Sequence, residues 1–267
     1  PLVEEWREKV FIQDVEICDA SEDFGVFGVH GPMSTEKIAS VLNHAGAPEP
    51  ELTFERGSMG DAGVTVVASD NPTGEEGYEV ICSATDAGET LDTLINRGLN
   101  AAPFGYRTWE SLTLEAGTPL FESELQGRIP NTAGLRHALD FEKGCYVGQE
   151  LVSKVDNRGQ PSSRLVGLRT DSLVEAGSTV AVDGEDVGAV TRAVEAPSVD
   201  APIALAFVDF DAGLDGATVE TPSEDAEDEE SASDPGTVDA DVVGLPFVTG
   251  SADSLRLPTY PGGDEDP

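Results

Sequence analysis

Basic residues are scarce in this sequence, and lysine is the scarcer of the two kinds. Fifteen Lys and Arg residues stand against 52 Asp and Glu residues, giving a formal net charge of −37, and only four of the bases are Lys. Because clustered bases are needed to bind nucleic-acid phosphates, this composition disfavours a nucleic-acid partner. At molar salt the Debye length falls to about 3 Å, which screens the self-repulsion of such a chain. The composition is typical of a cytoplasmic protein from an extreme halophile.

Cysteine and histidine are also few, which argues against a metal or redox centre. Cys18, Cys82 and Cys145 lie far apart, so the sequence has no CxxC pair and no disulfide framework is expected. The three histidines lack the spacing of metal ligands. We therefore expect no metal site in this chain.

Long apolar runs and nucleotide-binding motifs are absent as well. No stretch of about 18 apolar residues occurs, so no membrane-spanning helix is expected. The first residues lack both the pattern of a signal peptide and an initiator Met, so we expect the chain to begin within a longer protein. The G-x-G-x-x-G, P-loop and G-x-S-x-G motifs are missing, which leaves dinucleotide, P-loop and hydrolase interpretations without support.

The first half of the chain alternates between strand and helix patterns, which predicts an α+β region. Short apolar runs bounded by turn residues predict strands over residues 10–17, 24–29, 64–68 and 78–82. One predicted helix is capped by Ser34 and ends at Gly46. A second helix places Leu91, Leu94 and Ile95 on one buried face and ends at Gly98.

The second half changes character near residues 157–164. Short β-rich runs separated by Gly, Asp and Pro follow Arg164, and they predict a small antiparallel β-barrel. Asp183 and Gly184 predict a tight hairpin turn between two of its strands. We therefore expect one region over residues 1–160 and a barrel over 161–260.

An acidic segment interrupts the predicted barrel. Residues 223–241 hold nine acids and no base, so we expect a disordered insertion there, with order returning at residues 244–248. Residues 255–260 are predicted to form a last strand and a tail packed on the barrel. Solvation in brine is the simplest role for the acids, and a partner-binding tail is the alternative.

The few bases gather in the middle of the chain. Between residues 97 and 169 there are nine bases and eight acids, whereas the rest of the chain has six bases and 44 acids. Arg side chains grip carboxylates and phosphates with two parallel hydrogen bonds, so this stretch suggests an anionic ligand. The alternative is that these bases neutralise buried acids between domains.

One motif lies within that stretch. Residues 143–150 read KGCYVGQE, and they are followed by Lys154, the pair Arg158 and Gly159, and Arg164 before the barrel. This pattern resembles the YgfZ branch of the glycine-cleavage T-protein (GcvT) family. Segments 101–125, 187–194 and 201–208 resemble further parts of the family, so the resemblance extends from about residue 24 to residue 260 outside the acidic insertion.

The resemblance implies a fold, a cofactor and partners. The implied fold is a GcvT-like folate-binding α+β region followed by a small C-terminal antiparallel β-barrel, with the N-terminal part of the family fold missing before residue 1. The implied cofactor is tetrahydrofolate or a one-carbon derivative. Implied partners are iron–sulfur client proteins or a lipoyl carrier protein. The acidic residue that true aminomethyltransferases use in catalysis would lie in the missing part.

The resemblance also assigns the folate pocket. Glu115 is implied to hydrogen-bond the amide and amine edge of the pteridine, because one carboxylate can accept two parallel N–H donors. Tyr106, Arg107 and Trp109 follow a glycine turn that lines the pocket in the family. The alternatives without a ligand are a solvent-facing acid at the helix end for Glu115 and ordinary core packing for the aromatic residues.

The motif residues each have two candidate roles, and no catalytic residue is assigned. Cys145 is the candidate functional thiol, since Lys143 and the start of a predicted helix at residue 149 would favour a thiolate; a small buried hydrophobe is the alternative. Tyr146 would stack on a ring or pack in the core. Arg158 and Arg164 are candidates for the polyglutamate tail of the folate or for phosphate, and salt bridges are the alternative for each.

Three functions fit these observations. The first is a tetrahydrofolate-binding YgfZ-like protein that helps to maintain iron–sulfur enzymes. The second is an aminomethyltransferase of the glycine cleavage system. The third is a non-catalytic interaction module with a vestigial pocket.

Overall fold

The computed structural model describes residues 2–9, 14–221 and 236–260. The chain divides into two compact units, which we describe separately. One comprises Pro1–Ser69 and Gly77–Pro103, and the other comprises Asp70–Glu76 and Phe104–Pro267.

The first unit is built on a four-stranded antiparallel sheet. Its strands are β1 (Phe24–His30), β2 (Phe54–Met59), β3 (Ala62–Ala68) and β4 (Gly77–Ser83). They lie in the order β1-β4-β3-β2. The strands predicted over residues 24–29, 64–68 and 78–82 are confirmed. The strand predicted over 10–17 is wrong for residues 14–17, which have no regular structure, and residues 10–13 lie outside the described part of the chain.

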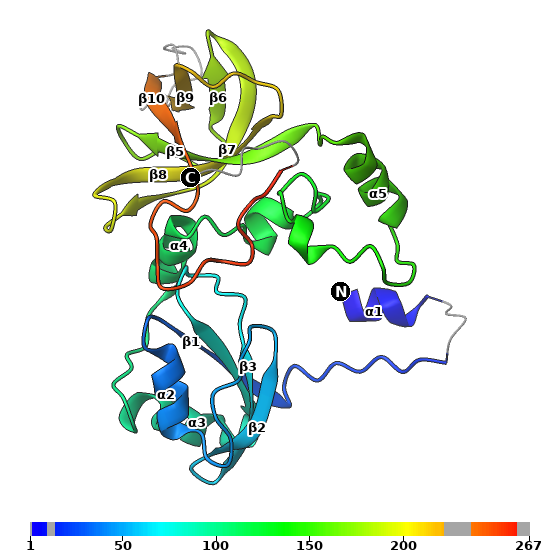
Figure 1. Ribbon diagram of the computed structural model, residues 1–267, viewed down its shortest axis with the longest axis vertical. Helices are drawn as coiled ribbons and strands as arrows, with labels where there is room; N and C mark the ends of the chain where they lie inside the picture. The colour runs from blue at the N-terminus through cyan, green and yellow to red at the C-terminus, as the bar shows by residue number, and fades with distance from the viewer. Residues whose placement is uncertain (1, 10–13, 222–235, 261–267) are drawn as a thin grey trace, which may run out of the picture. The chain divides into compact units, whose positions relative to one another are not determined.

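Two helices of the first unit share its core with the sheet (Figure 1). The helical elements are α1 (Leu2–Arg7), α2 (Ser34–Val41), the 3-10 turn η1 (Ala84–Asp86) and α3 (Ala87–Asn96). Ile38 of α2 and Leu94 of α3 join strand residues such as Val66 in one apolar core. The buried Lys37 donates from Nζ to the carbonyl oxygen of Leu99 at 2.7 Å, which ties α2 to the segment after α3.

Two helix predictions in this unit need correction. Ser34 is the first helical residue and not the cap; Met33 occupies the cap position, and no side chain caps the helix. The helix ends at Val41, before Gly46. In α3 the predicted core residue Leu91 is 42% exposed, because the buried face is formed by Thr90, Thr93 and Leu94. A prediction from apolar residues alone placed the buried face of α3 wrongly, because two of its buried residues are threonines.

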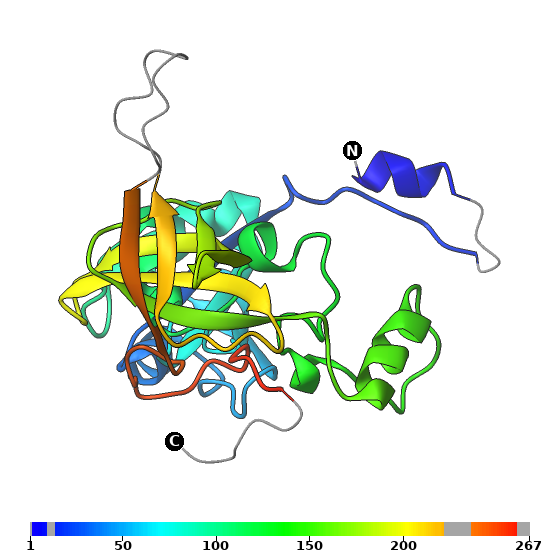
Figure 2. The same cartoon turned by 90° about the horizontal axis from the view of Figure 1, so that it is seen from above.

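The second unit contains a closed antiparallel barrel (Figure 2). Its strands are β5 (Ser163–Thr170), β6 (Thr179–Val182), β7 (Glu185–Ala196), β8 (Ala201–Asp209), β9 (Ala217–Thr221) and β10 (Gly236–Val243). They close in the order β10-β5-β8-β7-β6-β9. The predicted fold, an α+β region followed by a small antiparallel barrel, is confirmed. Asp183 and Gly184 form the predicted hairpin turn, with φ of 52° and 79°.

Strand β8 is buried on both of its faces. Ala204, Ala206 and Val208 belong to the barrel interior. Leu205 and Phe207 point outward and pack in a second apolar cluster with helix residues such as Leu114. The outer face of the barrel is therefore the platform on which the helical segment around Leu114 rests.

The helical elements of the second unit precede the barrel in the chain. They are α4 (Tyr106–Glu115), the π-helical turn η2 (Phe121–Leu125), the 3-10 turn η3 (Arg136–Ala138) and α5 (Gln149–Arg158). Because α4 packs on the outer face of β8, it belongs to the same compact unit as the barrel. The expected boundary between residues 160 and 161 stays a prediction, and the two compact units divide the chain at other positions.

Two expectations about the C-terminal part need correction. The disorder predicted over residues 223–241 fails for 236–241, which belong to β10; residues 222–235 lie outside the described part. In β10, acids alternate with inward residues such as Ala240, and both edges of the strand are paired, so the backbone is ordered despite the charge. Residues 255–260 form no strand. Within the described ranges, no helix has both the length and the apolar character needed to cross a membrane.

Candidate functional site

The residue that stands out chemically in the second unit is Glu115, at the C-terminal end of α4. The last turn of this helix is buried, and Leu114 lies in the cluster on the outer face of the barrel. The backbone carbonyl oxygen of Glu115 accepts hydrogen bonds from the N–H groups of Phe247 and Val248, at 2.9 and 3.2 Å. The backbone at Glu115 is therefore fixed to the segment that follows β10.

The side chain of Glu115 is buried but has few partners. The residue is only 5% exposed. Oε1 accepts one hydrogen bond, from the backbone N–H of Ser198 at 3.4 Å, and within the described residues the carboxylate has no other hydrogen bond and no basic partner. Since burying a carboxylate is costly unless donors satisfy it, Glu115 has capacity to accept N–H donors from a ligand. The predicted alternative of a solvent-facing acid does not hold for this residue.

A second buried glutamate shows the opposite arrangement. Glu124 is 0% exposed and lies 3.0 Å from Nε of Arg192 in an ion pair. Its Oε2 also accepts the backbone N–H of Leu120 at 2.7 Å. The guanidinium donates further to the hydroxyl of Thr113 at 3.1 Å and to the carbonyl oxygen of Thr118 at 2.7 Å. This saturated network joins α4, η2 and β7, so its role is structural.

A β-bulge aims Arg192 at this network. The register of β7 against β8 shifts between Val190, which pairs with Ala206, and Arg192, which pairs with Leu205. Ala206 faces the barrel interior and Leu205 faces outward, so the bulge turns Arg192 toward α4. This pair is not among the residues predicted from the sequence; the available signal was Arg192, a rare base within an apolar strand pattern.

The predicted pocket residues at the start of α4 are solvent-facing to different degrees. Tyr106 is 87% exposed, Arg107 is exposed and Trp109 is half-buried. The carbonyl oxygen of Trp109 accepts the hydroxyl of Thr113 at 2.8 Å. These three residues share α4 with Glu115, and their side chains do not line the hollow described below.

The KGCYVGQE motif forms an exposed loop that leads into α5, which starts at Gln149 as predicted. Lys143 Nζ lies 4.9 Å from the centre of the Tyr146 ring, and Gln149 Oε1 accepts the Tyr146 N–H at 3.2 Å. Gly148 precedes the helix with φ of 90°, a conformation that favours glycine. Cys145 is exposed with a free thiol, so the alternative of a buried hydrophobe is wrong for it.

Of the two arginines that follow the motif, the structure describes the side chain of Arg164. Arg164 donates from its guanidinium to the carbonyl oxygen of Ala212 at 3.3 Å and lies 6.0 Å from the centre of the Phe210 ring. Its buried Nε has no partner among the described residues. The side chain of Arg158 lies outside the described part of the structure.

Few of the described bases in the middle of the chain form salt bridges within their own unit. Among the described side chains of residues 97–169, the ion pair found for a base is that of Arg136 with Asp156. Arg128 instead lies 4.3 Å from the centre of the Phe207 ring, and Arg169 binds a backbone carbonyl oxygen. For the other bases of this stretch both interpretations, an anionic ligand and neutralisation of buried acids between domains, stay predictions.

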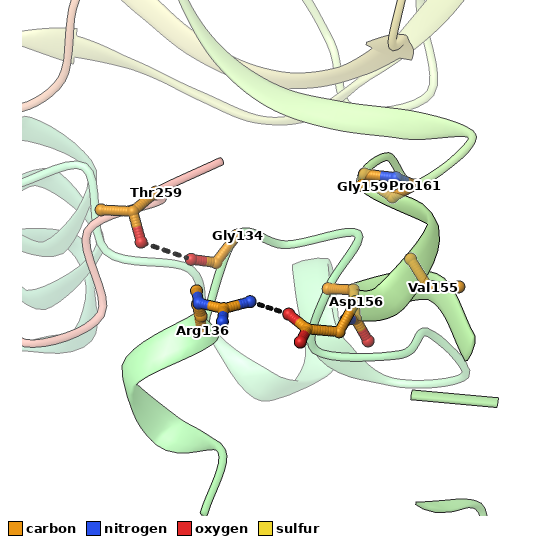
Figure 3. A pocket seen from close by; sticks show the side chains of 8 residues that line it. Gly134, Arg136, Val155, Asp156, Gly159, Pro161 and Thr259 are labelled. Carbon is orange, nitrogen blue, oxygen red and sulfur yellow. Dashed lines mark hydrogen bonds and ion pairs between the residues drawn. The ribbon is translucent and has the colours of Figure 1, made fainter. Parts of the chain in front are cut away.

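The Arg136–Asp156 pair lies at a small hollow in the second unit (Figure 3). The hollow is open to solvent and is also lined by Gly134, Gly159 and Thr259. In Figure 3 Arg136 and Asp156 point toward each other, and Thr259 donates to the carbonyl oxygen of Gly134 at 3.3 Å. No predicted pocket residue lines it, and its charges neutralise one another.

Comparisons with family models cover most of the chain. The model of the GCVT N-terminal domain matches residues 3–143. The model of the glycine cleavage T-protein C-terminal barrel domain matches residues 164–248. The second match coincides with the six-stranded barrel.

Individual relatives agree with these models. The chain is 30% identical to an aminomethyltransferase of Listeria innocua over 77% of the chain and 57% of the relative. It is 31% identical to a probable aminomethyltransferase of Halobacterium salinarum over 77% and 56%, and 33% identical to an aminomethyltransferase of Streptomyces avermitilis over 73% and 55%. The chain thus spans a little more than half the length of these relatives.

A solved structure supports the fold. The glycine cleavage system aminomethyltransferase T from Bartonella henselae superimposes with a TM-score of 0.70 at 21% identity. The similarity covers 86% of this chain and 61% of that one.

Proposed function

Because this chain belongs to the glycine-cleavage T-protein family, we propose that it binds tetrahydrofolate or a one-carbon derivative and serves as an aminomethyltransferase. The relatives quoted above are named aminomethyltransferase, which favours this function over the YgfZ-like role that the sequence motif suggested. In the proposed reaction, an aminomethyl group carried by a lipoyl protein gives its one-carbon unit to tetrahydrofolate and releases ammonia.

The observation that carries the proposal is the under-partnered carboxylate of Glu115. It is 5% exposed, and its one hydrogen bond, from Ser198, is 3.4 Å long. The pteridine ring presents adjacent amide and amine N–H groups, and two such donors would satisfy this carboxylate. The residues present therefore fit the cofactor, which when bound accepts the one-carbon unit.

The chain's own residues would bind and orient this cofactor. Glu115 would fix the rotation of the pteridine within its plane, since two parallel hydrogen bonds define a direction. Tyr106 and Trp109 would offer ring faces from α4, and Arg107 a nearby cation. Holding the reacting groups in one geometry supplies most of what such a transfer requires from a protein.

The bases in and after the motif would bind the acidic tail of the cofactor. Lys143 and Tyr146 lie together on the exposed loop, and Arg158 and Arg164 follow it in the chain. Because the rest of the protein is strongly acidic, these bases would be the attractive region for a carboxylate tail.

The proposal is tested by titrating the full-length gene product with 5-formyl-tetrahydrofolate at molar salt and following Trp fluorescence. Glu115→Gln should weaken binding by about tenfold to a hundredfold, the loss expected for hydrogen bonds to a charged group. The matched control is Glu110→Gln, an exposed position on the same helix, which should leave affinity unchanged. Absence of binding by the unaltered protein would contradict the proposal and leave the vestigial-pocket interpretation.

A second candidate function rests on Cys145. Its free, exposed thiol in the KGCYVGQE loop favours a folate-binding accessory protein that supports iron–sulfur client enzymes. Ammonia release from an aminomethyl-lipoyl donor selects the aminomethyltransferase. Loss of complementation of an iron–sulfur defect by Cys145→Ala, with folate binding intact, selects the accessory protein.

A further inference from the structure

The connection between strands β7 and β8 is a tight turn that lies against Glu115. The carbonyl oxygen of Ala196, the last residue of β7, accepts hydrogen bonds from the N–H groups of Val199 and Asp200, at 3.2 and 2.9 Å. Asp200 adopts φ of 53°, which lets the chain enter β8 at once. Residues 196–200, which we name the β7–β8 turn, therefore have a defined backbone shape.

A cation from a neighbouring strand anchors this turn. Arg169 lies near the end of β5, where it pairs in register with Ile203 of β8. Its guanidinium donates to the carbonyl oxygen of Val199 at 2.9 Å. A charge-assisted hydrogen bond of this kind holds the turn against the sheet.

The same turn contacts the candidate ligand-binding carboxylate. The N–H of Ser198 donates to Oε1 of Glu115 at 3.4 Å. This distance exceeds the roughly 2.7–2.9 Å of a strong charge-assisted bond, so the contact orients the carboxylate while leaving much of its acceptor capacity unused. Oε2 has no hydrogen-bond partner within the described residues.

We propose that the β7–β8 turn, held by Arg169, is a positioning element that aims Glu115 at the pteridine. The inference rests on the proposed function. The backbone of Glu115 is fixed by Phe247 and Val248, so the remaining freedom lies in its side-chain torsions. The Ser198 N–H favours the torsions that keep Oε1 beside it, and Oε2 together with the unused acceptor position of Oε1 is left for the two donors of the ligand. Arg169 and Ser198 touch no ligand in this arrangement, and they act through Glu115.

The test is a double-mutant cycle on the full-length protein, with 5-formyl-tetrahydrofolate as the probe. Arg169→Gln should weaken binding by roughly threefold to tenfold when Glu115 is present. In a Glu115→Gln background the same change should have no further effect, because the positioned charge is already gone. Arg128→Gln is the matched control, since Arg128 lies over the Phe207 ring and does not touch the turn.

A second pair of variants separates the amide of Ser198 from its side chain. Ser198→Pro removes the N–H that reaches Glu115, and should weaken binding as Arg169→Gln does. Ser198→Ala keeps the N–H and should bind like the unaltered protein. Circular dichroism verifies that each variant is folded, and Arg169→Gln keeps the test decisive if the proline variant is not.

The outcomes distinguish the two proposals. If Glu115→Gln weakens binding while Arg169→Gln and Ser198→Pro have no effect, or act equally in both backgrounds, the positioning role is overturned and the proposed function stands. If the unaltered protein does not bind the probe, both are overturned.

Discussion

The buried Arg192–Glu124 pair provides the largest single stability effect that the structure predicts. Arg192→Met removes the cation that lies 3.0 Å from Glu124, and the glutamate side chain has no solvent exposure. Removing one partner of such a pair leaves an uncompensated buried charge, which costs about 3–5 kcal/mol. The hydroxyl of Thr113 and the carbonyl oxygen of Thr118 also lose their donor, so we expect the upper part of this range.

The measurement is thermal unfolding at molar salt, followed by circular dichroism. For a protein of this size, a change of 1 kcal/mol lowers Tm by about 2–4 °C, so Arg192→Met should lower it by roughly 10–20 °C. Added salt should not restore the loss, because buried charges are screened little. The control is Lys9→Met, which removes a surface ion pair with Glu5 whose side chains are 52% and 62% exposed; it should cost less than about 1 kcal/mol.

A double variant checks the physical cause. Replacing Glu124 by Leu in the Arg192→Met background removes the orphaned charge, and much of the lost stability should return. A single variant that loses less than about 1 kcal/mol would refute this reasoning, since breaking a buried ion pair should cost several times as much. A double variant less stable than Arg192→Met would likewise contradict an electrostatic origin.

Three other regions of the molecule yield predictions of their own. Burial raises the pKa of Tyr260 from 10.0 to about 12, so the stabilising contribution of this side chain should be complete below about pH 10 and lost as the pH rises toward 12. Tyr260→Phe should remove this pH dependence of the free energy of unfolding, measured in urea. The variant should also be about 1–3 kcal/mol less stable at neutral pH, because Thr132 and Leu165 lose their hydrogen-bond partner. With a net charge of −37, the urea midpoint should rise steadily as KCl is raised to molar levels, and a flat response would contradict the screening argument. Gly188→Ala would place a methyl group against the backbone of Phe207, so its unfolding midpoint should fall well below that of Gly184→Asn, whose positive φ tolerates asparagine.

Short sequence patterns correctly predicted those parts of the fold whose structure depends on interactions between neighbouring residues. The hairpin at Asp183 and Gly184 follows from the positive φ that both residues adopt. The run that forms β8 is apolar without alternation, because the strand is covered on both faces, and it was still recognisable as β structure. For β8, the short length of the apolar run and the turn residues at its ends were informative where alternation was absent.

Other features depend on contacts between distant residues. The disorder predicted through residue 241 overlooked that β10 closes the barrel between β9 and β5, and this pairing overrides its acidic composition. The ion pair of Glu124 and Arg192 joins residues 68 positions apart, and a bulge that no local rule signalled makes it possible. Leu91 is wrongly predicted as a core residue because the burial of Thr90 and Thr93 cannot be recognised from hydrophobicity.

The sequence indicated candidate residues of the site but did not indicate how they are arranged in space. Family resemblance selected Glu115, and burial with a single long hydrogen bond supports that choice independently. No sequence pattern indicates that the β7–β8 turn contacts Glu115, because Ser198 contributes a backbone N–H, which any residue other than proline carries. The roles of the exposed Cys145 and the half-buried Trp109 in the site stay predictions.

The most direct test of this account is a crystal structure of the full-length gene product with 5-formyl-tetrahydrofolate. We expect Oε2 of Glu115 within about 2.7–2.9 Å of a pteridine N–H, with Oε1 still beside the N–H of Ser198. A pteridine bound with none of its N–H groups on Glu115 would contradict it.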